Sequence, residues 1–211
     1  TGQVTEKQKE IIDDIYESIL RMGDLVNLLL QMARVESGRM KVEPALMSLE
    51  EITKDALNSM RQVISKKKQK VEISVDPDPF PKIFLDKIIL NQVIQNILTN
   101  ASQYSGEGKN IRISIKMGKE FITYEIKDEG IGIPNEQQSK IFDKFFRASN
   151  AVRMVPSGNG LGLSLVRSVV TTWGGSAWFE SEENKGSTFY FTIPAKGMKP
   201  KIGEVSLAVT Q

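Results

Sequence analysis

One aspartate and three groups of glycines have the residue types and spacing most able to do chemistry in this chain. Asp128 follows residues 121–127, whose alternation is typical of a β-strand, and a glycine turn comes directly after it. The glycines are Gly130 and Gly132, then Gly158, Gly160 and Gly162, and finally Gly186. Glycines at such corners permit a positive φ or a close approach by another backbone or a ligand. For each group taken alone, ordinary hairpin and helix-cap glycines are the alternative interpretation.

A helix is predicted after the second glycine group, because Leu161, Leu165 and Val169 recur at helical spacing. The free amides and the positive dipole end at its N-terminus would suit a polyphosphate. The segment lacks the βαβ context and downstream acidic residue of a dinucleotide fingerprint, and no Gly-Lys-Ser/Thr follows as in a Walker loop. The glycines alone therefore do not identify one class of nucleotide-binding protein.

A second candidate site is a polar stripe on the helix predicted over residues 90–104. Gln92, Asn96, Asn100 and Gln103 recur at i, i+4 and i+3 spacing between apolar flanks. Asparagine is a mediocre helix residue, because its amide competes for local backbone hydrogen bonds. Amide oxygens are hard ligands suited to Mg²⁺ beside a phosphate. The spacing is equally compatible with a solvated helix face.

Five groups of residues occur in a characteristic order. They are Asn96 with Asn100; Asp128 with Gly130 and Gly132; Phe142 with Phe145, Phe146 and Arg147; Gly158 with Gly160, Leu161, Gly162 and Leu163; and Gly186 with Ser187 and Thr188. In this order they resemble the catalytic domain of sensor histidine kinases, which belongs to the ATPase superfamily shared with gyrase, heat-shock chaperones and mismatch-repair ATPases. The resemblance covers roughly residues 36 to 194.

The resemblance implies a site for ATP and Mg²⁺. Asp128 would accept a hydrogen bond from the adenine amine, and Asn96 with Asn100 would hold Mg²⁺ against the triphosphate. Arg147 and Arg153 would stabilise charge on the γ-phosphoryl group. The other implied nucleotide contacts are Gln103, Tyr104, Gly130, Gly132, Ile133, Gly158, Gly160, Leu161, Gly162, Leu163 and Thr188.

Two positions depart from the family pattern. Gln103 stands where the family often has lysine, so a phosphate contact is lost and weaker ATP binding or a different triphosphate pose is predicted. Trp173 stands where histidine is common, before a Gly-Gly turn, and its role is predicted to be structural.

Strands and helices alternate without βαβ regularity, which predicts an α+β fold. We expect a two-layer sandwich of one mixed β-sheet with helices on one face, preceded by a long amphipathic helix. The expected elements are an edge strand over 40–47 interrupted by Pro44, a helix from a capping box at Ser48 to about Lys67, a strand at 71–75, and hairpins pairing 111–115 with 121–127 and 176–180 with 188–193.

The N-terminal helix is predicted over residues 5–35, where apolar residues recur every three or four positions. This seam comprises Ile12, Ile15, Ile19, Met22, Val26, Leu29 and Ala33. It is typical of a coiled coil or helix bundle, and the opposite face, which carries both acidic residues and lysines, is not the basic face of a membrane-surface helix. Residues 32–38 resemble the end of the second helix of a histidine kinase dimerisation and phosphoacceptor hairpin, which implies homodimerisation through this helix.

The first helix of that hairpin, which bears the phosphorylated histidine in the family, is missing, and the chain contains no histidine. We therefore expect a fragment of a longer kinase, with a naturally truncated relative as the alternative. The expected division is 1–38 for the hairpin helix, 39–194 for the ATP-binding domain and 195–211 for a loosely held tail in which Val205, Leu207 and Val209 alternate.

Composition agrees with an enzyme domain: 40% of residues are hydrophobic and 26% charged. The net charge of +2, from 28 basic and 26 acidic residues, implies no nucleic-acid partner. The lack of cysteine excludes disulfides and thiolate metal sites. No apolar run approaches the roughly 18 residues of a membrane span, so we expect no membrane contact by this chain and a cytoplasmic location, with a membrane-anchored parent left open.

Three functions remain compatible with the sequence. The first is the ATP-binding catalytic portion of a sensor histidine kinase, which transfers the γ-phosphoryl group to a histidine outside this chain for relay to a response-regulator aspartate. The second is a nucleotide-binding interaction module whose transfer activity has decayed, with Gln103 as the hint. The third is a serine kinase or ATPase of the same superfamily, which the N-terminal helix argues against.

Overall fold

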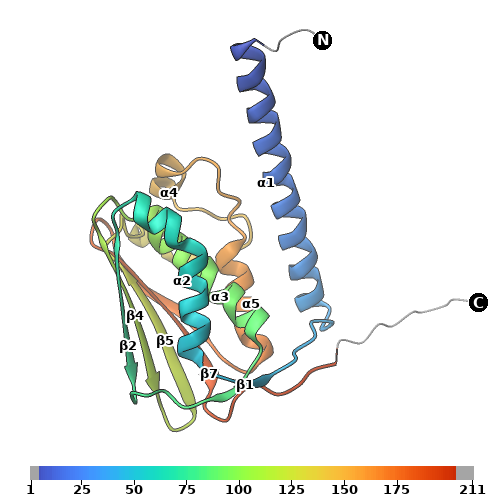
Figure 1. Ribbon diagram of the computed structural model, residues 1–211, viewed down its shortest axis with the longest axis vertical. Helices are drawn as coiled ribbons and strands as arrows, with labels where there is room; N and C mark the ends of the chain where they lie inside the picture. Colours follow the sequence, from blue (N-terminus) through green and yellow to red (C-terminus); the bar gives the residue numbers. More distant parts are fainter. Residues whose placement is uncertain (1–4, 203–211) are drawn as a thin grey trace, which may run out of the picture.

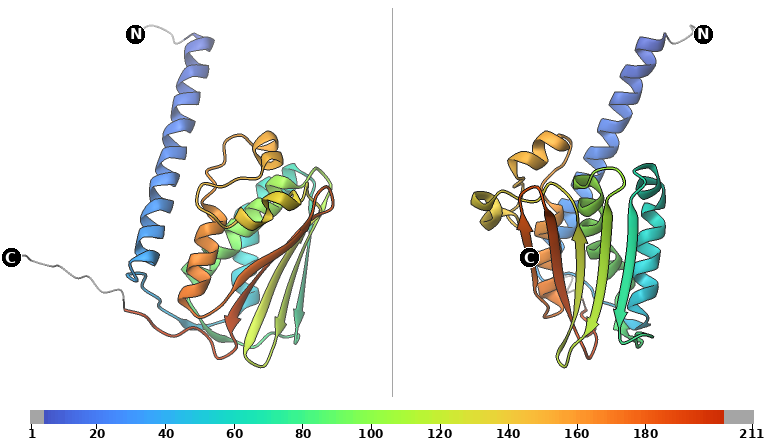
Figure 2. Two further views of the ribbon diagram at one scale, coloured as in Figure 1. Left: turned by 180° about the vertical axis from the view of Figure 1, so that it is seen from behind. Right: turned by 90° about the vertical axis from the view of Figure 1, so that its left-hand side faces the viewer.

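The computed structural model describes residues 5–202, in which a five-stranded sheet and a layer of helices follow a long N-terminal helix (Figure 1). In chain order the elements are α1 (Glu6–Glu36), β1 (Ala45–Met47), α2 (Leu49–Lys66), β2 (Lys70–Asp76), β3 (Ile83–Leu85), α3 (Lys87–Tyr104), β4 (Asn110–Met117), β5 (Phe121–Asp128), the 3-10 helix η1 (Asn135–Lys140), α4 (Ser149–Met154), α5 (Gly162–Thr172), β6 (Ala177–Glu182) and β7 (Gly186–Pro194). Figure 2 shows α2, α3 and α5 gathered on one side of the sheet, which confirms the predicted α+β sandwich.

The main sheet has the strand order β2-β4-β5-β7-β6. Both predicted hairpins form, β4 with β5 and β6 with β7, and β2 lies parallel to β4. Alternate residues of the central strands face the helices and are buried, as period-two alternation requires. Tyr124 stacks on Phe191 of β7 with 4.7 Å between ring centroids, and its hydroxyl lies 2.9 Å from the Thr53 hydroxyl of α2. This buried pair ties the sheet to the helix layer.

Helix α3 lies between the sheet and the cleft described below, and its sequence explains both faces. Its N-terminus is capped by Asp86, whose Oδ1 accepts hydrogen bonds from the amides of Ile88 and Ile89. Its buried residues are Ile89, Leu90, Val93, Ile94, Ile97, Leu98, Ala101 and Ser102. The remaining arc carries the polar stripe, whose members are half-buried. The apolar arc therefore fixes which way the stripe points.

Two predicted segments differ from the structure. The edge strand expected over 40–47 is shortened to β1, which begins after Pro44 because proline has no amide to donate to a ladder. The tail expected to be loose is held as far as residue 201: Met198 is 3% exposed, and Lys201 forms an antiparallel bridge with Val42. Residues Val205, Leu207 and Val209 lie outside the described residues.

Helix α1 forms as predicted, and within residues 5–202 its heptad seam remains largely exposed. Ile15 is 54% exposed and Met22 is 60% exposed, whereas Met32, on a neighbouring face, is 3% exposed against α5. Near the same end of α1, the side chain of Gln92 on α3 donates a hydrogen bond to the side chain of Gln31. Within residues 5–202, no helix is both long and apolar enough to cross a membrane.

Candidate nucleotide-binding site

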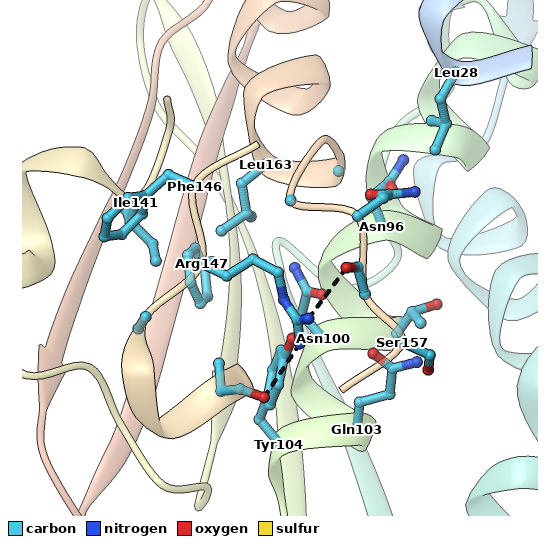
Figure 3. Close-up of a pocket in the computed structure, with 18 of the residues that line it drawn as sticks. Leu28, Asn96, Asn100, Gln103, Tyr104, Ile141, Phe146, Arg147, Ser157 and Leu163 are labelled. Carbon is cyan, nitrogen blue, oxygen red and sulfur yellow. Dashed lines mark hydrogen bonds between the residues drawn. The ribbon is translucent and has the colours of Figure 1, made fainter. Parts of the chain in front are cut away.

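A cleft of about 830 Å³ opens between α3, the lid segment (residues 143–160) and α1. Figure 3 shows Asn96, Asn100, Gln103 and Tyr104 on α3, with Arg147 approaching from the lid segment. Small-molecule sites typically have volumes of about 300–1,000 Å³. The cleft is therefore large enough for a nucleotide.

Asn96 presents its side-chain oxygen rather than its nitrogen to the cleft. Its Nδ2 donates to the Gln92 carbonyl one turn earlier, at 2.9 Å, which fixes the orientation of the amide. A Cβ atom at Gly162 would lie 2.9 Å from the Asn96 Oδ1. The glycine thus lets the N-terminus of α5 approach this oxygen. An oxygen that can ligate a metal ion therefore lies close to a helix N-terminus that can bind an anion.

Asp128 ends β5 and is 4% exposed. Its Oδ1 accepts hydrogen bonds from the amides of Gly130, at 2.8 Å, and Ser187, at 3.1 Å. Among residues 5–202 no donor reaches Oδ2, so that atom can accept a hydrogen bond from a ligand in the cleft. Burial raises the pKa of Asp128 to about 6, and the two backbone hydrogen bonds oppose this rise. A buried carboxyl group with a raised pKa in a cleft is a candidate functional residue.

The glycines after Asp128 make room for protein backbone. A Cβ atom at Gly130 would lie 2.5 Å from the Tyr104 carbonyl oxygen, and one at Gly132 would lie 2.0 Å from the Glu182 carbonyl oxygen. Gly132 also has a φ of +62°, which favours glycine. In the structure, the absence of side chains at these two glycines lets the turn pack against the end of α3 and the β6–β7 turn.

Arg147 holds the lid segment together from within. Its guanidinium donates to the carbonyl oxygens of Pro156, at 3.0 Å, Gly158, at 3.1 Å, Ala151 and Val155. A Cβ atom at Gly158 would lie 2.8 Å from the guanidinium carbon, so a side chain at this position would require the arginine to shift. In this conformation the arginine has four carbonyl partners inside the lid segment rather than a free face toward a phosphate.

The N-terminus of α5 adds the positive end of a helix dipole to the cleft. Its N-cap residue, Leu161, makes no side-chain capping bond, so amides of the first turn remain available to an anion. Among the described residues that line the cleft, Arg147 is the only lysine or arginine. Gln103 occupies its predicted place on the α3 wall without contributing charge.

The cleft brings together most of the predicted site. Lining it are Asn96, Asn100, Gln103, Tyr104, Asp128, Gly132, Ile133, Arg147, Gly158, Gly160, Gly162 and Leu163. Four predicted residues do not line it: Gly130, Arg153, Leu161 and Thr188. Alternation along β7 explains the last, because Ser187 and Phe189 face the cleft and Thr188 lies on the opposite face. Arg153 is exposed on α4, where its Nε donates to the Ser149 carbonyl.

The wall made by α1 is the part of the cleft that sequence reasoning missed. Its lining residues are Ser18, Met22, Asp24, Leu25, Asn27, Leu28 and Gln31. The available signal was Leu25 and Leu28, which widen the apolar stripe of α1 beyond the heptad seam. These two side chains pack against the hydrophobic core.

Comparisons with known proteins agree with this geometry. A family described as "Histidine kinase-, DNA gyrase B-, and HSP90-like ATPase" matches residues 85–197. The sensor protein KdpD of Clostridium acetobutylicum is 32% identical over 192 residues, covering 90% of this chain and 21% of KdpD. The sensor histidine kinase WalK of Bacillus subtilis is 34% identical over 178 residues, covering 83% of this chain and 29% of WalK. The chain thus spans less than a third of either relative.

A solved structure shares the fold, including the long helix. Full-length ShkA in complex with AMPPNP superposes with a TM-score of 0.79 and 21% identity, covering 95% of this chain and 41% of ShkA. At this identity the similarity establishes the arrangement of elements and no more.

Proposed function

Since this chain belongs to the histidine kinase-, DNA gyrase B- and HSP90-like ATPase family, we propose that it is the ATP·Mg²⁺-binding catalytic portion of a sensor histidine kinase. It would transfer the γ-phosphoryl group to a histidine outside this chain, for relay to a response-regulator aspartate. One observation carries the proposal: among residues 5–202 no donor reaches Oδ2 of the buried Asp128 carboxylate, which lies in the same cleft as the α5 N-terminus and Asn96.

The residues present fit a purine nucleotide triphosphate. Asp128 Oδ2 suits the exocyclic amine of adenine, and Ile133 and Phe189 supply apolar surface in the same cleft. The uncapped amides of α5 suit phosphate oxygens. Asn96 and Asn100 supply the oxygens that would hold Mg²⁺, and no cluster of three or more acidic, cysteine or histidine ligands occurs within residues 5–202. When bound, Mg²⁺ would neutralise negative charge on the triphosphate.

The chain's own contribution to phosphoryl transfer would be positioning. Asp128 orients the base, the α5 amides fix the phosphates, and the lid segment held by Arg147 covers them and excludes water. Arg147 would have to release some of its four carbonyl partners before touching a γ-phosphoryl group. A role for Arg153 in transfer requires α4 to turn toward the cleft, since its side chain is exposed and bonded within α4.

The exposed face of α1 supports the proposed partners. Ile12, Ile15, Ile19, Met22 and Val26 are each at least half exposed along one seam, which suits packing against a phosphoacceptor helix and a second α1 in a homodimer. The response regulator would then bind beside the phosphorylated histidine. These partners and ATP imply a cytoplasmic site of action.

Calorimetry with ATP or ADP in millimolar Mg²⁺ tests the nucleotide part of the proposal. Heat of binding is expected for the wild type and should be strongly reduced for Asp128→Asn. No heat at millimolar nucleotide, or unchanged affinity in the variant, would contradict it. The transfer part is tested by adding a separate histidine-bearing phosphoacceptor domain and radiolabelled ATP. Acid-labile label is expected on the added domain, and none on this chain, which has no histidine.

A nucleotide-binding interaction module with decayed transfer activity is the second candidate. It is favoured by Gln103, which adds no charge to the phosphate region, and by the engagement of Arg147 inside the lid segment. ATP binding without transfer to any supplied phosphoacceptor domain would support this candidate over the kinase.

A further inference from the structure

The segment that follows the ATP-binding domain packs on the linker that precedes it. Beyond β7, residues 195–202 run beside the linker between α1 and α2, and Figure 1 shows the two approaching each other below α5. Val42 and Lys201 exchange two backbone hydrogen bonds, with N–O distances of 2.9 Å and 3.0 Å, and Val42 is 2% exposed. The linker is therefore fixed at Val42 by the C-terminal segment.

Met198 anchors this C-terminal segment to β3. Its amide donates to the Phe84 carbonyl at 2.8 Å, and its sulfur accepts a hydrogen bond from the Asp86 amide at 3.4 Å. Gly197 precedes it with a φ of +86°, and a Cβ atom there would lie 2.8 Å from the Phe84 carbonyl oxygen. Only glycine fits this conformation and spacing. Specific contacts with β3 thus fix the position of the segment on the domain.

Asp86 connects the contacts of Met198 to α3, the helix that carries Asn96 and Asn100. One carboxylate oxygen caps α3 and the other accepts a hydrogen bond from the Glu43 amide of the linker at 2.8 Å. Further along the linker, β1 pairs with β3 over three residues each. An isolated two-stranded ribbon of this length is marginal in water, so the seating of Met198 beside β3 stabilises the pairing.

We propose that residues 195–202 are a clamp that fixes linker residues 42–47 to the ATP-binding domain and so confines the hinge of α1 to residues 37–41. Gly38, with a φ of +69°, ends the helix inside this hinge, and its neighbours are exposed except for half-buried Met40. Without the clamp, the mobile stretch would extend to residue 47, and α1 would sample more orientations relative to the cleft. The clamp is independent of nucleotide binding.

Hydrogen exchange measured by NMR tests the clamp in the full chain. Truncation after Ala195 and Gly197→Val should each speed exchange of the Val42 amide by roughly thirty-fold, the effect of losing about two hydrogen bonds, and should also speed exchange in β1. Truncation after Ile202 and Lys199→Val, at an exposed position of the same segment, are matched controls expected to leave Val42 unchanged. Unchanged Val42 exchange after truncation at Ala195 would overturn the proposal.

A distance measurement tests the hinge itself. The chain has no cysteine, so Lys9→Cys on α1 and Lys116→Cys on β4 give a unique pair of spin-label sites, both exposed. The distance distribution should be broader after truncation at Ala195 than after truncation at Ile202. Equal widths in the two proteins, with Val42 exchange accelerated, would show that the clamp does not limit α1 and would refute the hinge assignment. ATP affinity should be the same in both, which separates this result from the proposed function.

Discussion

Ser187 donates its amide to the Asp128 carboxylate at 3.1 Å, across 59 residues of sequence. The bond, together with that from Gly130, commits Oδ1 to the protein and leaves Oδ2 to a ligand. The Gly-Ser-Thr group thus contributes a backbone amide that orients the Asp128 carboxylate, for which we propose base recognition.

Affinity for ATP should fall as the pH drops below about 6. A neutral carboxyl group presents a proton to the adenine amine instead of accepting a hydrogen bond from it. Burial raises the pKa of Asp128 to about 6. Between about pH 7.5 and pH 5 the ionised fraction drops roughly ten-fold, and the dissociation constant should rise by the same factor. Calorimetry at each pH measures it. Titration of ATP itself is removed by comparison with Asp128→Asn, whose affinity should lack this component; equal pH profiles would exclude Asp128 as the acceptor.

The same carboxylate should lower the stability of the free protein near neutral pH. The pKa of Asp128 in the folded state, about 6, lies above its ordinary value of 3.8. Between these two pH values the folded state therefore binds more protons than the unfolded state. The free energy of unfolding should therefore fall as the pH rises from about 4 to about 6, by roughly 3 kcal/mol, and stay level above. Without nucleotide, Asp128→Asn should be the more stable protein at pH 7 in urea unfolding, although it binds ATP less well. A less stable variant at pH 7 would show that burial of this charge has no net cost.

Gln103→Lys should strengthen ATP binding. The α3 wall of the cleft carries no cationic side chain, and Gln103 faces the cleft from the end of the polar stripe. A charge placed there beside a polyphosphate should raise affinity by about ten-fold at low salt and less at high salt. Asn58→Lys, an exposed position on α2, gives the same change in net charge as a control. Equal effects of the two substitutions would mean that position 103 does not contact phosphate.

More of the fold than of the site could be predicted from the sequence. Alternation in β4 and β5 and the helical period of α3 report burial directly, so the sandwich and both hairpins follow from local pattern. The strand over residues 40–47 was overextended, because only a long-range partner, β3, decides where β1 begins.

Most of the predicted site residues line the cleft, whereas contacts made through the backbone could not be predicted from the sequence. Thr188 was chosen within the Gly-Ser-Thr group, but the alternation of β7 turns Ser187 to the cleft. The role of Arg147 inside the lid segment depends on four carbonyl groups, which leave no sequence signature. The α1 wall arises from packing between distant helices and is equally invisible to local pattern.

Asn96→Ala should weaken the magnesium-dependent part of ATP binding. The amide is held by the Gln92 carbonyl so that its oxygen faces Gly162 at the N-terminus of α5. Loss of this oxygen should lower affinity by roughly thirty-fold in Mg²⁺, the effect of about 2 kcal/mol, and have little effect in excess chelator. Asn58→Ala on the exposed face of α2 controls for the substitution. A similar loss with and without Mg²⁺ would assign Asn96 to packing instead.

Arg147→Gln should loosen the lid segment before it affects chemistry. The guanidinium has carbonyl partners at Ala151, Val155, Pro156 and Gly158, and a glutamine reaches at most one or two of them. NMR order parameters of residues 156–159 should fall from about 0.85 toward 0.6 or below, with weaker ATP binding. Arg153→Gln, which removes a charge at an exposed position on α4, should leave these order parameters unchanged. If Arg147→Gln abolished transfer to a supplied phosphoacceptor domain while the order parameters and ATP affinity stayed at wild-type values, the arginine would act on the γ-phosphoryl group itself, and the lid role argued from its carbonyl contacts would be refuted.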